Sequence, residues 1–79
     1  MSVAIVKAPL PGIFYRRPSP EEASFKEVGD AIAVGDTVAL VEAMKSFFPV
    51  EAETSGTLLR FLVEDGAVVE ADQPIAEME

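Results

Sequence analysis

The chain contains no cysteine and no histidine. Without cysteine it can form no disulfide, and without either residue it lacks the usual transition-metal ligands and the commonest general base. These absences argue against a metalloenzyme and against a hydrolase built on a Cys–His or Ser–His pair. We therefore expect no catalytic residues and no metal-binding residues in this chain.

Basic residues and long apolar runs are also scarce. Six Lys and Arg against fourteen Asp and Glu give a formal charge of −8, whereas nucleic-acid binding requires clustered positive charge. No stretch reaches the roughly 20 apolar residues that span a bilayer, and the apolar run near the N-terminus is too short for a signal peptide. We expect a soluble, cytoplasmic protein that binds neither nucleic acid nor membrane.

The length of 79 residues predicts a single domain spanning residues 1–79. A domain of this size buries only about 60% of its unfolded surface, which leaves room for a core but not for a deep active-site cavity. Runs of β-branched and aromatic residues lie between Gly or Pro residues, without a sustained helical stripe. The sequence thus predicts an all-β fold with strands at 3–7, 12–16, 31–34, 37–42, 47–53, 57–63, 67–70 and 74–78.

An internal repeat relates the two halves of the chain. Residues 29–42 align with residues 66–79 at a shift of 37, and residues 12–16 align with residues 56–60 at a shift of 44. Turn glycines, small or β-branched pairs and a terminal glutamate coincide in these alignments. The halves are therefore expected to be two copies of one four-stranded unit.

The difference between the two shifts places seven extra residues in the first half, close to residues 18–24. Pro18 and Pro20 cannot donate ladder hydrogen bonds and favour extended neighbours, which predicts an inserted loop instead of a further strand. One interpretation is a tolerated surface insertion, because loops accept extra length at little cost. The other is a protrusion that contacts whatever group Lys45 carries.

Lys45 lies between the two copies, where a hairpin is expected. If Met44 and Lys45 form a two-residue turn, the numbers of cross-strand partners sum to 89, so Glu42 faces Phe47. One apolar face then contains Ala39, Val41, Phe48, Val50 and Ala52. In the second copy the same parity places Ala76 and Met78 inside and Glu77 and Glu79 outside.

Met-Lys is an unfavourable pair for such a turn. Two-residue hairpins favour primed turns, which require positive φ and therefore prefer Gly, Asn or Asp. The residues at 44 and 45 are thus expected to serve another purpose, and our central hypothesis is that Lys45 carries a covalent cofactor. The alternative is that Met44 only covers the end of the sheets and Lys45 only solvates the tip.

The motif Glu42-Ala43-Met44-Lys45 at a midpoint hairpin resembles the biotinyl domain of biotin carboxyl carrier proteins of the acetyl-CoA carboxylase type. The resemblance extends from residues 8–15 through the Arg17-Pro-Ser-Pro-Glu21 segment to residues 64–66 and 73–75. It implies a flattened β-barrel, or hammerhead, of two four-stranded antiparallel sheets related by a pseudo-two-fold axis. Ser46 departs from the family, which commonly has Met after the lysine.

The resemblance also implies roles for individual residues. Lys45 would carry covalent biotin, and the residues that a biotin protein ligase recognises would be Glu42, Ala43, Met44 and Ser46. Loop 17–24 would correspond to the family's "thumb", which lies against the biotin, and it comprises Arg17, Pro18, Ser19, Pro20, Glu21, Glu22, Ala23 and Ser24.

By this resemblance the chain is a non-catalytic, monomeric carrier that moves carboxyl groups from a biotin carboxylase to a carboxyltransferase, for acetyl-CoA or another acyl-CoA in fatty acid synthesis. The carrier's N-terminal oligomerisation segment and Ala/Pro-rich linker are absent here, so we expect an excised domain or a free-standing small carrier. One alternative is a lipoyl carrier of a 2-oxoacid dehydrogenase or glycine-cleavage system, against which Met44 and the insertion count. The other is an unmodified hammerhead that serves only as an interaction module.

Overall fold

Eight β-strands run through the part of the chain that the computed structural model describes, residues 3–17 and 21–79. No helix occurs in these ranges, so none that could cross a membrane is found there. The all-β prediction is confirmed. The strands are β1 (Ala4–Lys7), β2 (Gly12–Tyr15), β3 (Ala31–Ile32), β4 (Thr37–Ala43), β5 (Ser46–Glu51), β6 (Gly56–Phe61), β7 (Val68–Val69) and β8 (Pro74–Met78).

The strands form two four-stranded antiparallel sheets, with orders β1-β8-β6-β3 and β5-β4-β2-β7. Exchanging each strand of the first half for its counterpart in the second half (β1 for β5, β2 for β6, β3 for β7, β4 for β8) converts one order into the other. Each sheet takes two strands from each half, and the exchange of halves maps one sheet onto the other, as a pseudo-two-fold axis does. The predicted architecture is confirmed.

Loop hydrogen bonds repeat with the same symmetry. Gly35 N–H donates to the carbonyl of Ala52 over 2.9 Å, and Asp72 N–H donates to the carbonyl of Ala8 over 2.9 Å. Both donors have positive φ, 89° for Gly35 and 64° for Asp72. The repeat read from the sequence is thus a repeat of backbone conformation as well as of residue type.

The core lies between the two sheets and is wholly apolar among the described residues. Its largest fully buried side chains are Phe14, Leu58, Ile75, Met78, Val38, Val41 and Val69. Because these residues come from both halves, neither four-strand copy encloses a core alone. Burial of this shared apolar surface is the main stabilising term for so small a domain.

The predicted register of β4 and β5 is confirmed, with Glu42 opposite Phe47 and Ala39 opposite Val50. A β-bulge between Thr37 and Ala39 interrupts the alternation, so that Val38 is buried together with its neighbour Ala39. In β8, Ile75 and Ala76 are likewise both buried, where the register of β1 and β8 shifts. Strict alternation could not predict these adjacent buried residues, because a bulge changes the parity of the strand.

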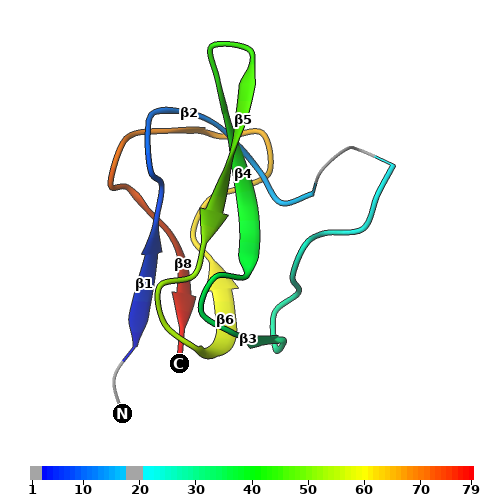
Figure 1. Ribbon diagram of the computed structural model, residues 1–79, viewed down its shortest axis with the longest axis vertical. Helices are drawn as coiled ribbons and strands as arrows, with labels where there is room; N and C mark the ends of the chain where they lie inside the picture. The colour runs from blue at the N-terminus through cyan, green and yellow to red at the C-terminus, as the bar shows by residue number, and fades with distance from the viewer. Residues whose placement is uncertain (1–2, 18–20) are drawn as a thin grey trace.

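Phe48 is less buried than the other residues predicted to share the inner face. It has the expected parity, but 39% of it is exposed, whereas Val41 opposite it is fully buried. The β4–β5 hairpin extends beyond the other strands at the top of the molecule (Figure 1). Because the facing sheet ends before the hairpin does, Phe48 has less to pack against.

Several predicted strands are shorter in the structure. The ranges 31–34 and 67–70 reduce to Ala31–Ile32 and Val68–Val69, and 47–53 and 57–63 become Ser46–Glu51 and Gly56–Phe61. The remaining residues of these ranges lie outside the strands, several of them in turns. In one such turn, Asp36 N–H donates a hydrogen bond of 3.0 Å to the carbonyl of Ala33. Residue types alone did not show where these turns begin.

The chain leaves β2 after Tyr15 and returns through a loop on one side of the molecule (Figure 1). Phe25 N–H donates to the carbonyl of Arg16 over 2.9 Å and closes the base of this loop. The Arg16 guanidinium lies 4.2 Å from the centre of the Phe61 ring and 3.7 Å from the carboxylate of Glu27. Arg16 therefore fixes the point at which the loop leaves the body.

Candidate functional site

Met44 and Lys45 form the turn between β4 and β5, with Ala43 paired to Ser46 directly below it. Their φ angles are 52° and 66°, so both residues are in the left-handed region, as a type I′ turn requires. This geometry matches the right-handed twist of the two strands and keeps the tip narrow. Met44 is 96% exposed, and Lys45 is exposed beside it.

Positive φ is costly for both residues. A left-handed conformation costs an ordinary L-residue about 1–2 kcal/mol, because the Cβ approaches the following carbonyl oxygen. Among the described residues, Asp72 alone shares this conformation without being glycine. Asp tolerates positive φ better than Met or Lys, so the strain is concentrated at the tip of the hairpin.

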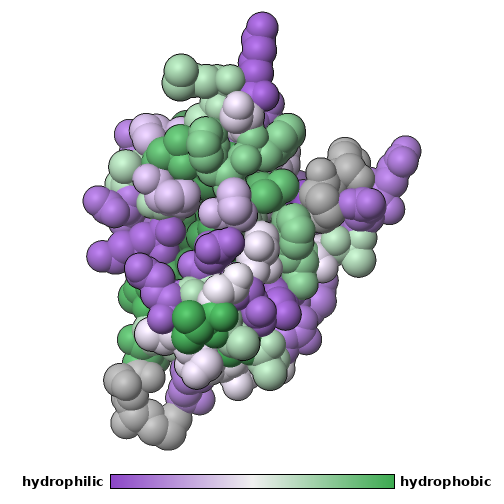
Figure 2. Space-filling model, in the orientation of Figure 1, coloured by the Kyte–Doolittle hydropathy of each residue, from purple (hydrophilic) through white to green (hydrophobic). Residues whose placement is uncertain are grey.

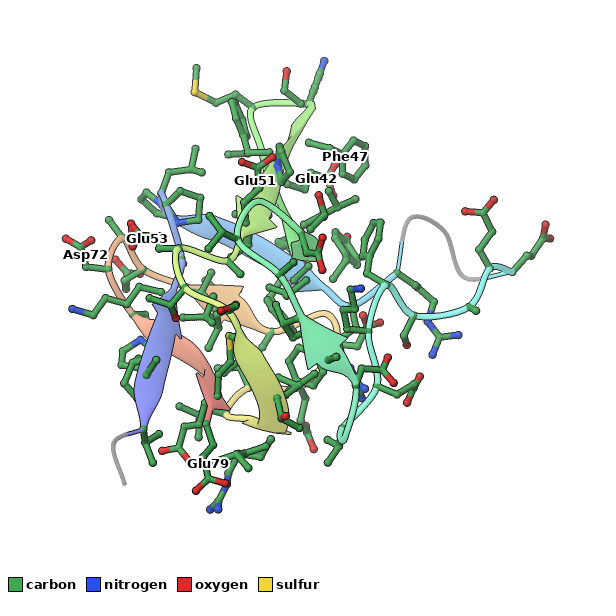
Figure 3. All side chains as sticks on the ribbon, turned by 60° about the horizontal axis from the view of Figure 1, so that its bottom comes forward. Glu42, Phe47, Glu51, Glu53, Asp72 and Glu79 are labelled. Atoms are coloured by element: carbon green, nitrogen blue, oxygen red, sulfur yellow. The ribbon has the colours of Figure 1, made fainter. Side chains whose placement is uncertain are left out.

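Glu42 and Phe47 lie side by side on the outer face of the sheet below the tip (Figure 3), and Tyr15 of β2 contacts both of them. The Tyr15 hydroxyl donates to Glu42 Oε1 over 3.0 Å, and the rings of Tyr15 and Phe47 are 6.3 Å apart at 52°. The hydrogen bond to Glu42, with partial desolvation and the charges of Glu42 and Asp65, raises the pKa of Tyr15. These contacts tie β2 to the hairpin and restrain the strands that carry Lys45.

An open groove of about 730 Å³ lies between the edge strands β1 and β5, and residues 42–47 are not among the residues that line it. In residues 3–17 and 21–79, no group of His, Cys, Asp and Glu could hold a metal ion. The geometry presents the amine of Lys45 at the exposed tip of a hairpin, which suits covalent modification of that amine by another protein.

The structure brings five of the predicted site residues together in one hairpin: Glu42, Ala43, Met44, Lys45 and Ser46. Of the predicted loop, the structure describes Arg17 and residues 21–24. Arg17 and residues 21–24 form no strand, and in this described part of the loop no hydrogen bond or ion pair reaches the hairpin. Residues 18–20 lie outside the described residues.

Two residues beside the site were missed from sequence. The expected register already placed Phe47 opposite Glu42, so it could have been included. Tyr15 is 27 residues away from Glu42 in the chain, and no local signal relates them. Only the pairing of β2 with β4 brings its hydroxyl to the carboxylate.

A small β-sheet domain with a lysine at the tip of a midpoint hairpin has the architecture of a cofactor-attachment domain. Residues 4–78 match the family described as "Biotin-requiring enzyme". The chain belongs to this family.

Curated relatives agree with this assignment. The chain is 43% identical over 79 residues to the biotin carboxyl carrier protein of acetyl-CoA carboxylase of Haemophilus influenzae, covering 100% of this chain and 51% of that protein. It is 49% identical over 71 residues to the protein of the same name from Pseudomonas aeruginosa, covering 90% and 46%. The chain therefore spans about half the length of these relatives.

A solved structure supports the fold independently. Urea carboxylase of Kluyveromyces lactis contains a region that superposes with a TM-score of 0.82 at 29% sequence identity. The match covers 100% of this chain and 6% of the carboxylase. The chain is thus similar to a small part of a much larger protein.

Proposed function

We propose that Lys45 carries covalently attached biotin and that this chain is the biotin carboxyl carrier domain of an acetyl-CoA carboxylase. The observation that carries the proposal is the position of Lys45, at the strained, exposed tip of the hairpin that joins the two halves. The names of the relatives supply the cofactor and the enzyme.

The residues at the tip fit the attachment of biotin. An amide bond from the biotin carboxyl group to Lys45 Nζ needs an accessible amine, and exposure of residues 44–46 provides it. When bound, biotin supplies a ring nitrogen that accepts a carboxyl group and returns it. The chain itself holds the attachment point away from the body and limits its motion through the hairpin and the contacts of Glu42.

We propose that a biotin protein ligase recognises the tip through Glu42, Ala43, Met44 and Ser46. Met44 and Ser46 flank the target lysine and are exposed, whereas Glu42 and Ala43 are half-buried and fix the turn from below. A ligase that reads this arrangement recognises a folded shape instead of a peptide. Attachment should therefore require the folded domain.

For loop 17–24 we propose a contact with the attached biotin. Its support is that the loop leaves β2 directly after Tyr15, whose hydroxyl binds Glu42 on the hairpin strand. Deleting residues 18–24 should leave the fold intact, because Phe25 already closes the loop base on Arg16. The mobility of the biotin ring, measured by NMR relaxation, should then increase; unfolding of the deletion variant would instead show that the loop is structural.

The remaining partners follow from the carrier role. We propose that a biotin carboxylase and a carboxyltransferase, both on other chains, use the tethered group in turn, while this domain acts as a cytoplasmic monomer without chemistry of its own. Tethering raises the local concentration of the cofactor at both enzymes. The charge of −8 favours transient docking to basic surfaces and disfavours self-association.

Intact-mass measurement after co-expression with a biotin protein ligase tests the attachment. We expect one biotin adduct in the wild type and in the Lys7→Arg and Lys26→Arg variants, and none in Lys45→Arg. Lys7 and Lys26 are the other two lysines of the chain, so they are matched controls. A lipoyl adduct, or no adduct on well-folded protein, would refute the biotin assignment in favour of a lipoyl carrier or an unmodified module.

A further inference from the structure

A row of side chains crosses the outer face of the sheet β5-β4-β2-β7, just behind the tip. Phe47, Glu42, Ile13 and Val68 are paired in sequence from one strand to the next. Phe47 is 56% exposed, Ile13 36% and Val68 73%. We call these four residues the outer row; it is apolar apart from Glu42.

The internal repeat provides a comparison for the outer row within the same molecule. At the opposite end, the equivalent positions on the other sheet hold Val3, Glu79, Thr57 and Ala31. Their backbone is arranged in the same way, since Ala31 pairs with Thr57 and Thr57 N–H donates to the carbonyl of Glu79 over 2.7 Å. At the opposite end the same backbone arrangement therefore carries smaller or more polar side chains: Val3 in place of Phe47, Thr57 in place of Ile13 and Ala31 in place of Val68.

One further outward position differs in the same direction. Leu40 lies on the lysine-bearing sheet, and its equivalent Glu77 forms a 3.0 Å ion pair with Arg60, although the cross-strand partners of Leu40, Pro49 and Tyr15, have the apolar equivalents Ile5 and Leu59. The fold thus tolerates polar residues at these outward sites. Figure 2 shows hydrophobic side chains below the hairpin tip and further ones toward the lower end of the same view.

The outer row behind Lys45 thus carries larger apolar side chains than the equivalent row at the opposite end, where Val3 is exposed as well, although the fold is built without them there. Exposed apolar groups that gather on one face mark an interaction surface. Phe47 lies about 7 Å from Lys45 along the strand, and the outer row spans about 14 Å across four strands. A protein that acts on Lys45 and approaches along this face would meet both.

We propose that the outer row is the docking surface for the biotin protein ligase. The ligase surface that fits it is apolar and presents a lysine or arginine to Glu42, whose second carboxylate oxygen makes no contact with Tyr15. Turn residues alone offer little contact area, whereas alignment of an amine for amide formation requires a firmly held substrate. The inference rests on the proposed function, because it names the surface by which that site is recognised.

The test exchanges two residues of the outer row for their counterparts in the repeat, in the double variant Ile13→Thr/Val68→Ala. Val34→Ala is the control, because Val34 is 66% exposed and lies in the turn before β4, outside the outer row. Each purified apo protein is titrated with a bacterial biotin protein ligase, biotin and ATP, and KM and kcat are measured. Thermal unfolding of each variant verifies that it is folded.

We expect the KM of the double variant to rise about tenfold, because the variant buries less apolar surface against the ligase than the wild type does. The kcat should change less than twofold. Val34→Ala should behave like the wild type. An unchanged KM in the double variant, or an equal rise in Val34→Ala, would overturn the docking surface while leaving Lys45 as the attachment site. Failure of the wild type to accept biotin would instead overturn the proposed function.

A second measurement does not depend on substitutions. In NMR spectra of the ¹⁵N-labelled Lys45→Arg domain titrated with the ligase, the amides of Ile13 and Val68 should shift or broaden, and those of Ala31 and Thr57 should not. Perturbation confined to residues 43–46 of the tip would contradict the docking surface.

Discussion

Replacing Met44 by glycine should stabilise the domain. At a φ of 52°, Met44 bears the cost of the left-handed region, about 1–2 kcal/mol for an L-residue. Glycine has no such cost, but its greater conformational freedom in the unfolded chain reduces the gain in the free energy of unfolding by about 0.5–1 kcal/mol. The net gain should be about 0.5–1 kcal/mol, which corresponds to a rise in Tm of roughly 3–6 °C for a domain of this size.

Two residues of the turn between β7 and β8 provide the controls for this substitution. Asp72→Gly, at a φ of 64°, should give a smaller gain because Asp tolerates the left-handed region. Ala71→Gly should lower Tm, since Ala71 is not among the residues with positive φ. Unfolding is followed by circular dichroism at fixed pH and ionic strength. A Tm for Met44→Gly at or below that of the wild type would refute the strained-turn argument.

The same substitution separates stability from recognition. If the ligase reads the Met44 side chain, Met44→Gly should be biotinylated more slowly although it is more stable. The rate of adduct formation by intact mass, at equal protein and ligase concentrations, measures this. Unchanged biotinylation would show that Met44 is not part of what the ligase recognises.

Three further predictions concern the scaffold. Gly12→Ala should destabilise by about 1–3 kcal/mol in urea unfolding, because a Cβ there would collide with the backbone carbonyl of Glu42; an unchanged midpoint would contradict this. Glu42→Gln should lower the pKa of Tyr15 toward its ordinary 10.0, read from ultraviolet absorbance of the only tyrosine in the chain. The N–H of Ala33 and the ammonium of Lys26 hold the pKa of Asp36 below its ordinary 3.8, so this stabilisation is complete above the unfolded-state pKa and is lost as pH falls through the lower folded-state value. The difference in urea midpoint between wild type and Asp36→Asn should therefore be larger at about pH 7 than at about pH 2.5.

The sequence predicted those features of the site that depend on residues close together in the chain. The hairpin register follows from the alternation of apolar residues around Met44 and Lys45, and the structure has the same partners. Phe48 departs because its exposure depends on where the facing sheet ends. Tyr15 was missed because its contact with Glu42 depends on the order of the strands in the sheet, which the alternation of apolar residues does not encode.

The sequence by itself determined that the chain is all-β, that it consists of two copies of one unit and that a single lysine lies at their junction. Each of these conclusions depends on residue type and spacing, which can be read from the sequence directly. Only the tertiary structure decided that each sheet draws strands from both halves, that bulges bury Val38 and Ile75, and that the turn is primed. These features arise because two sheets must bury one shared core, and packing between distant strands fixes them.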